Sequence, residues 1–217
     1  MTQILGAVTS EGIMVATDSM ATEFDPQGIE RRFAVEKLFS VGSHAFIVSG
    51  GIGISVDLSL RFKRYVEEKG LPGIEAMIPA AGAFLGGQLG EAFKASRRPT
   101  GERAELERIY FLLGGYSFRS AETPYQLALW GSETGRVPLR RIQVGGGVAI
   151  PRSLAAEVRL SRMAMAKRPL GEILNFARQF LEKLAASGPD VGAPFRFGVV
   201  TSGGFKLLEP GRVPERC

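Results

Sequence analysis

Apolar and polar residues alternate along the first fifty positions, as they do in half-buried strands. Four segments show this pattern and are predicted strands: residues 3–9, 13–18, 33–39 and 45–49. The turn Ser10-Glu11-Gly12 joins the first two as a hairpin, in which Gly12 supplies a positive φ. A polar loop over residues 22–30 leads to the third. So many strands in so short a stretch indicate an antiparallel sheet and not a strand–helix–strand unit.

The apolar spacing then changes to that of amphipathic helices. Four helices are predicted: from Ile54 to just before Gly70, from Ile74 to Phe93, from Leu154 to Met165, and from Pro169 to Leu184. Further strands are predicted at residues 109–113, 125–130, 137–144, 195–200 and 205–208. A charged loop covers residues 97–107, and Gly145-Gly146-Gly147 opens the second helical stretch.

The resulting order is strands, two helices, strands, two helices, strands. Two antiparallel sheets packed face to face, with helices on both outer sides, satisfy this order. We therefore predict an α+β fold, a four-layer αββα sandwich. No internal linker divides the chain, so residues 1–217 are expected to form a single domain.

Composition and charge exclude several classes of function. Hydrophobic residues make up 45% and charged residues 23% of the chain, which are globular values. The excess of 27 basic over 22 acidic residues is spread over scattered pairs, so it does not indicate nucleic-acid binding. The longest uncharged stretch, residues 38–56, is rich in Gly and Ser, which disfavours a transmembrane helix. With its one cysteine at Cys217, the chain is expected in the cytoplasm.

Lys37 is the first candidate for chemistry. In the predicted third strand it shares a face with Val35 and Phe39, where an unpaired ammonium would be costly. If Thr9 faces Ile13 in the hairpin, Asp18 lies opposite Ile4 and one diagonal step from Thr2. Asp18 is then the expected partner of Lys37. A purely structural buried ion pair, or a lysine whose ammonium reaches water along the strand, also explains this pattern and needs no catalytic role.

Thr2 adds a nucleophile to this pair. The small side chain at position 2 permits removal of Met1, which would place a hydroxyl and an α-amine on one residue. An α-amine has a pKa of about 7.7–8.0, so it can act as a general base at neutral pH. Lys37 would lower the proton affinity of that amine. No cofactor is expected, and the single histidine, His44, offers little support for a metal site.

Four elements of the sequence together resemble the amino-terminal half of proteasome β-type subunits and their bacterial relatives. They are Thr2-Gln3-Ile4, the segment Gly12 to Thr22, Val35-Glu36-Lys37-Leu38-Phe39, and Ser49-Gly50-Gly51. Their order and approximate spacing match over about the first sixty residues. The resemblance implies the amino-terminal-nucleophile (Ntn) hydrolase fold and a threonine-type endopeptidase that acts on peptides or unfolded proteins. It also implies a homo-oligomeric ring or double ring, with an ATPase or adaptor as a possible partner.

The resemblance assigns roles to individual residues. Thr2 is the nucleophile, Asp18 and Lys37 are the charged pair beside it, and Gly50 offers its backbone N–H to the oxyanion. Thr22 pairs its backbone with an extended substrate, and Met20, where an arginine is usual, lines the first specificity pocket.

Two departures from the family keep other functions open. Gly146 stands where the family has a serine that assists the terminal amine, and Asp190 aligns with a family aspartate only after a shift. One alternative is a catalytically inactive, ring-forming scaffold that keeps Met1. Another is an Ntn hydrolase that cleaves a small amide.

Overall fold

The computed structural model describes residues 2–25, 27–95, 108–132 and 139–209. The strands of this part are β1 (Ile4–Val8), β2 (Ile13–Thr17), β3 (Met20–Phe24), β4 (Glu30–Ala34), β5 (Leu38–Val41), β6 (Ala45–Gly51), β7 (Ile109–Tyr116), β8 (Tyr125–Ser132), β9 (Arg140–Ile142), β10 (Gly147–Ile150), β11 (Arg196–Thr201) and β12 (Gly204–Leu208). Its helices are α1 (Ile54–Lys69), α2 (Ile74–Ala95), α3 (Leu154–Met165) and α4 (Leu170–Ser187).

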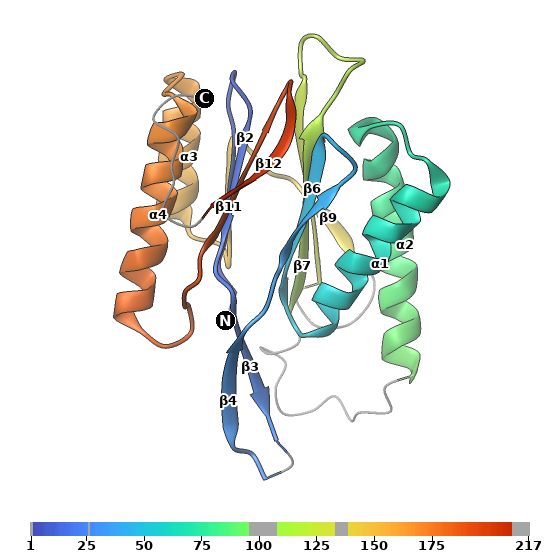
Figure 1. Cartoon of the computed structure of the whole chain (residues 1–217), viewed down its shortest axis with the longest axis vertical. Coiled ribbons are helices and arrows are strands. Elements are labelled where there is room, and N and C mark those ends of the chain that lie inside the picture. Colours follow the sequence, from blue (N-terminus) through green and yellow to red (C-terminus); the bar gives the residue numbers. More distant parts are fainter. Residues whose placement is uncertain (1, 26, 96–107, 133–138, 210–217) are drawn as a thin grey trace.

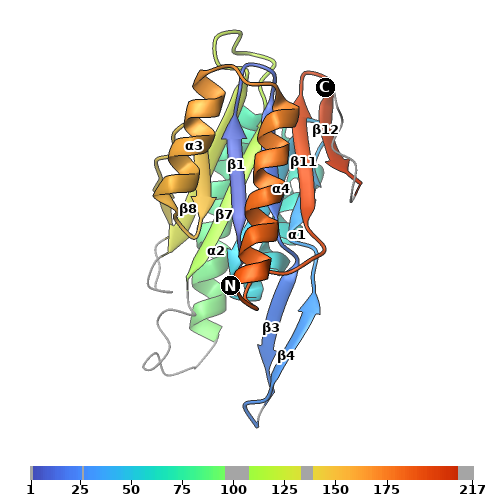
Figure 2. The ribbon, with the colours of Figure 1, turned by 90° about the vertical axis from the view of Figure 1, so that its left-hand side faces the viewer.

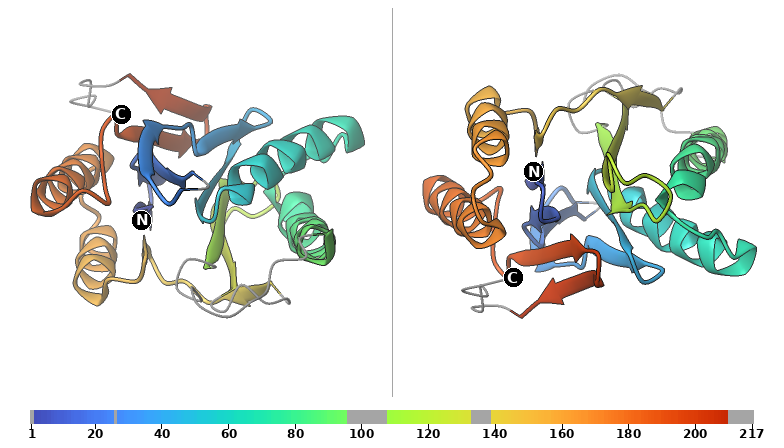
Figure 3. Two further views of the ribbon diagram at one scale, coloured as in Figure 1. Left: turned by 90° about the horizontal axis from the view of Figure 1, so that it is seen from below. Right: turned by 90° about the horizontal axis from the view of Figure 1, so that it is seen from above.

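Two antiparallel five-stranded sheets form the centre of the molecule. Their strand orders are β10-β1-β2-β11-β12 and β5-β6-β7-β8-β9, and β3 and β4 form a separate two-stranded sheet. Helices α1 and α2 cover the outer face of the second sheet, and α3 and α4 cover that of the first (Figures 1 and 3). The β3–β4 hairpin projects beyond these layers (Figure 2). The fold is therefore α+β, with antiparallel sheets layered between helices, as the order of elements predicts.

Central strands that are buried on both faces explain the apolar runs in the sequence. Ile4 points into the cluster between the sheets, whereas its neighbour Leu5 packs in the cluster beneath α3 and α4. In β6, Phe46 faces the other sheet and Ile47 faces α1 and α2. Because side chains alternate along a strand, each such strand serves two layers of core.

The four predicted helices are confirmed, with small shifts at their ends. Gly70 ends α1 with a φ of 58°, the left-handed conformation that favours glycine. The amino end of α1 has no side-chain cap, although Ser55 and Asp57 are both suitable types. Helix α4 begins at Leu170, one residue after its predicted start, with Pro169 at the amino-terminal cap position.

The region between residues 20 and 41 differs from the prediction. Residues 22–30 are not simply a loop, because they contain parts of β3 and β4, which pair as a hairpin. The predicted strand over residues 33–39 is instead the end of β4 and the start of β5, with Lys37 between them. Every residue of β4 is exposed, so this strand lacks the alternation by which a strand is recognised.

The predicted register of the first hairpin is wrong by one residue. Ile4 faces Thr17 and Val8 faces Ile13, so Thr9 does not face Ile13 and Asp18 does not face Ile4. The turn is tighter than predicted because Thr9 itself closes it: its hydroxyl accepts hydrogen bonds from the backbone N–H groups of Glu11 and Gly12.

Two later strands also differ from the prediction. The predicted strand over residues 137–144 is reduced to β9, and residues 133–138 lie outside the described residues, as does the predicted loop at 97–107. Gly147 begins strand β10, which pairs with β1, instead of opening a helical stretch. A Cβ at Gly147 would lie 2.6 Å from Leu160 Cβ and 2.8 Å from Glu157 O, both on α3. Glycine at this position therefore lets α3 pack directly on β10.

This close approach predicts the cost of a single methyl group. Gly147→Ala is expected to lower the free energy of unfolding by about 1–3 kcal/mol, because backbone atoms of α3 cannot move aside. The matched control is Gly145→Ala, whose Cβ has one neighbour, Ser161 Oγ at 4.0 Å, and which is expected to change stability by less than about 0.5 kcal/mol. Urea unfolding measures both. Equal midpoints for the two variants would contradict this account of the packing.

Candidate functional site

Asp18 is held by the backbone where β1 and β2 begin to separate. The Asp18 N–H donates to Gln3 O at 3.2 Å, and the Gln3 N–H donates to Asp18 Oδ1 at 2.9 Å. A second backbone N–H, that of Met20, donates to Asp18 Oδ2 at 3.0 Å. The Asp18 side chain is fully buried. Backbone N–H groups alone therefore hold both carboxylate oxygens of Asp18 in place, without the help of a cation.

Lys37 links the Asp18 carboxylate to Thr2, the nucleophile candidate. Lys37 Nζ lies 3.2 Å from Asp18 Oδ1, 2.9 Å from Thr2 Oγ1 and 2.6 Å from Met20 O. The Lys37 carbonyl accepts a hydrogen bond from the Ser49 N–H, which holds the residue beside β6. An ammonium has three donors, and these three acceptors use all of them. The structure thus brings Thr2, Asp18 and Lys37 together, as the sequence predicts.

Burial dominates the electrostatics of the pair. Desolvation lowers the pKa of the Lys37 ammonium, while the Asp18 charge opposes this effect. Desolvation also raises the pKa of the Asp18 carboxyl, and Lys37 together with the backbone donors of Gln3 and Met20 opposes that shift. A buried lysine whose pKa is lowered, next to a hydroxyl, is suited to general-base chemistry.

Gly50 lies against Thr2. A Cβ at Gly50 would be 3.2 Å from Thr2 Cγ2 and 3.3 Å from Thr2 Cβ, which is closer than side chains ordinarily pack. Glycine thus lets strand β6 approach the nucleophile candidate across the seam between the two sheets. Donation by the Gly50 N–H to an oxyanion stays a prediction.

The two predicted substrate-binding residues have different places. Met20 contributes its backbone carbonyl to Lys37, a role that sequence reasoning missed. The Met20 side chain lies against Gly192: a Cβ added at Gly192 would be only 2.5 Å from Met20 Cε. Thr22 is exposed in β3 and pairs with Arg32 of β4, and the hydrogen bonds that join Thr2, Asp18 and Lys37 do not include it.

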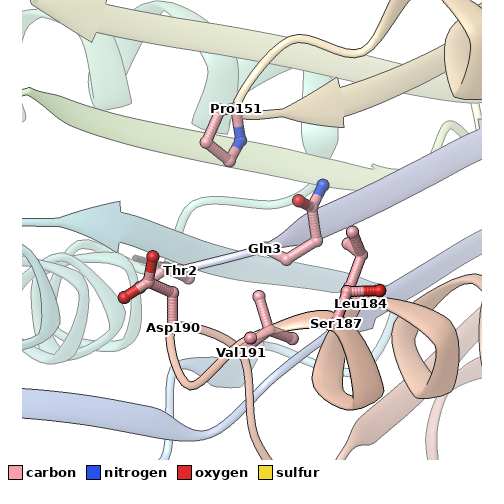
Figure 4. Close-up of a pocket in the computed structure, with 8 residues that line it drawn as sticks. Thr2, Gln3, Pro151, Leu184, Ser187, Asp190 and Val191 are labelled. Carbon is pink, nitrogen blue, oxygen red and sulfur yellow. The ribbon is translucent and has the colours of Figure 1, made fainter.

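A cavity of about 260 Å³ opens beside Thr2 (Figure 4). Thr2 and Gln3 line it together with segments from the other end of the chain: Pro151 after β10, Leu184 and Ser187 of α4, and Asp190 and Val191 of the connection to β11. Asp190, to which the resemblance assigned no role, thus lines the same cavity as Thr2. Sequence reasoning also missed Gln3 as a residue that lines this cavity. Its only signal in the sequence is its position directly after Thr2.

The part of the chain that the structure describes lacks two kinds of feature. Within it, no three His, Cys, Asp or Glu side chains gather as metal ligands do. None of its helices combines the length and the apolar character needed to cross a bilayer.

The buried pair predicts strongly non-additive mutational effects. Lys37→Met leaves the Asp18 carboxylate buried without its cation and is expected to lower the free energy of unfolding by about 3–5 kcal/mol. Adding Asp18→Asn removes that charge, so the double variant is expected to regain part of the loss. Urea unfolding of the two single variants and the double variant measures this coupling. A double variant whose loss equals the sum of the single losses would show that the pair is not coupled.

The comparisons with known proteins add no assignment. No family model matches this chain, and a search of curated proteins gives no match. The functional interpretation therefore depends on the geometry around Thr2, Lys37 and Gly50.

Proposed function

We propose that this protein is a threonine-type peptidase of the Ntn hydrolase kind, with Thr2 as its nucleophile. One observation carries the proposal: Lys37 Nζ lies 2.9 Å from Thr2 Oγ1 while it is bound to the buried Asp18. The Thr2 hydroxyl satisfies the third donor of the buried ammonium, and the same contact puts its proton within reach of the neutral amine. The layered α+β fold and the close approach of Gly50 to Thr2 support the same function.

In the proposed first step, neutral Lys37 takes the proton of Thr2 Oγ1 as that oxygen attacks the amide carbonyl carbon. The ammonium so formed donates to Asp18 and Met20 O, which already lie within hydrogen-bond distance. The carbonyl oxygen becomes an oxyanion, to which the Gly50 N–H donates. When the C–N bond breaks, Lys37 returns its proton to the leaving nitrogen, and the acyl group stays on Thr2 as an ester.

Removal of Met1 completes the site. It frees the α-amine of Thr2, whose pKa of about 7.7–8.0 suits a general base at neutral pH. In this proposal the amine takes a proton from the water that attacks the ester and passes it to Thr2 Oγ1 as the ester C–O bond breaks, so the amine and Lys37 are both neutral again at the end of the cycle. The two basic groups thus divide the two steps of the reaction. An extended substrate pairing with β3 near Thr22 and assembly of copies into a ring both stay predictions.

Removal of the nucleophile tests this function. Thr2→Ala is expected to lower kcat/KM for fluorogenic peptides at least 1000-fold, while Thr2→Ser, which keeps a hydroxyl, retains measurable activity. Both replacements keep a small residue after Met1, and intact mass confirms that Met1 is absent from each protein. Cleavage at equal rates by Thr2→Ala and the unchanged protein would contradict the proposal. A mass that retains Met1, with no activity, would favour the scaffold function.

The role of Lys37 predicts a particular pH dependence. Since the neutral amine is the base, kcat/KM rises with pH through the pKa of Lys37, which burial places below its usual value of 10.5. Lys37→Arg keeps a positive charge at this position, but a guanidinium stays protonated and cannot act as a base. The value of kcat/KM is therefore expected to fall about 100-fold or more at every pH. The control is Lys69→Arg at the exposed end of α1, which is expected to leave the profile unchanged. An unchanged profile in Lys37→Arg would exclude Lys37 as the base.

A further inference from the structure

The β3–β4 hairpin is a two-stranded sheet that projects from the rest of the molecule (Figures 1 and 2). A sheet of only two strands is marginally stable in water, and further strands or a covering helix are needed for stability. Every residue of β4 is exposed, and among the described residues β3 is the only strand that pairs with it. The outer edge of β4 is therefore open to an added strand.

The hydrogen-bond pattern of the hairpin shows which residues of β4 face this open edge. The N–H of Val35, one residue past the end of β4, donates to Ser19 O at 2.8 Å. Because hydrogen-bonded pairs alternate along an antiparallel ladder, every second residue of β4 counted from Val35 turns its backbone groups toward β3. Glu30, Arg32 and Ala34 turn theirs outward. An added strand must form its hydrogen-bonded pairs with these three residues.

The side chains along this strand are complementary to those of a second copy. Ile29 and Phe33 share one face and are large apolar residues with exposed fractions of 61% and 47%. When two copies of β4 run antiparallel with Arg31 opposite Arg31, Ile29 faces Phe33 of the second copy. In the same register Glu30 faces Arg32, and both turn their backbone groups to the shared edge. The neighbouring registers instead set Glu30 against Glu30 or Arg32 against Arg32, which like charge disfavours.

The remaining charge in this register is that of Arg31, which faces its own counterpart. Asp25 Oδ2 lies 3.8 Å from Arg31 Nη2 in the same chain, so each arginine brings an acidic neighbour. Exposed ion pairs add little stability, so backbone hydrogen bonds and the apolar pairs supply the affinity, while the charges select the register. Antiparallel pairing also places the body of each copy beyond the tip of the other hairpin, which keeps the two bodies apart.

We propose that β4 binds β4 of a second copy of this chain, so that the two hairpins form one four-stranded sheet of order β3-β4-β4-β3. A twofold contact uses the same residues on both copies, and the pattern of residues 29–33 meets this condition. The contact involves neither Thr2 nor Lys37. Its test is therefore independent of the proposed peptidase function.

Two charge reversals test the contact by sedimentation equilibrium. Glu30→Arg sets arginines against each other, and Arg32→Glu sets glutamates against each other, so each variant alone is expected to raise the dissociation constant of self-association at least about 10-fold. In a mixture of the two variants, position 30 of one chain and position 32 of the other again carry opposite charges, and association is expected to return. Positions 30 and 32 still repel within each chain, so only contact between chains explains that return. Glu182→Arg, the same exchange at an exposed position of α4, is expected to leave association unchanged.

A disulfide tests the register. The two Arg31 residues form a pair without mutual hydrogen bonds, in which Cα atoms lie about 4.5 Å apart, within the range that a disulfide spans. Cys217→Ser removes the one natural cysteine. In that background Arg31→Cys is expected to form a covalent dimer when the thiol oxidant diamide is added. Glu23→Cys, an exposed position of β3 that pairs with Arg31, lies about 14 Å from its counterpart across the four-stranded sheet and is expected to stay monomeric.

The cysteine variants keep the proposal open to contradiction should either charge reversal fail to fold. A protein that stays monomeric at every concentration would overturn the proposal. So would unchanged association in both charge variants, together with equal cross-linking at positions 23 and 31. Activity of Thr2→Ala toward peptides has no bearing on these outcomes, so the contact and the peptidase function can fail separately.

Discussion

A buried ammonium must have its donors satisfied, and this requirement organises one end of the molecule. Lys37 Nζ lies within hydrogen-bond distance of Thr2 before β1, Asp18 after β2 and Met20 at the start of β3. Leaving any of these acceptors out would cost the desolvation of a charge without its compensation. The three chain segments are therefore held together at a point where no regular sheet pairing joins all of them.

The sequence predicts the parts of the fold in which local pattern and tertiary environment agree. Helix α4 has an apolar stripe of Ile173, Leu174, Ala177 and Leu181, all buried, so its period is visible without a structure. Strand β4 is exposed along its whole length, and its residues carry no such pattern. Strand β10 begins at Gly147, a residue that favours no strand locally and is required because α3 packs there. Such tertiary requirements leave no periodic trace in the sequence.

The candidate site was predictable to the extent that it follows from charge. A lysine between apolar residues needs a carboxylate, and this argument identified Asp18 although the assumed register was wrong by one residue. The error had little effect because the long Lys37 side chain, which comes from outside the hairpin, reaches both Thr2 before β1 and Asp18 after β2. The Met20 carbonyl as an acceptor for Lys37, and the cavity beside Thr2, were missed for another reason. A backbone carbonyl has no sequence signature, and the cavity depends on residues 184–191, far along the chain.

Thr2 lies where the two sheets meet, and the residues on its β6 side and on its α4 side differ in what they can bind. On the side of β6, glycine at position 50 removes a side chain and brings backbone against the hydroxyl-bearing residue. On the side of α4, Gln3 and the residues around Val191 line a cavity. Backbone donors suit a carbonyl oxygen, which every peptide bond has, whereas a cavity discriminates among residues by the side chains that fit it. A nucleophile between the two sides can therefore combine a general reaction with a choice of substrate, and each property can change without the other.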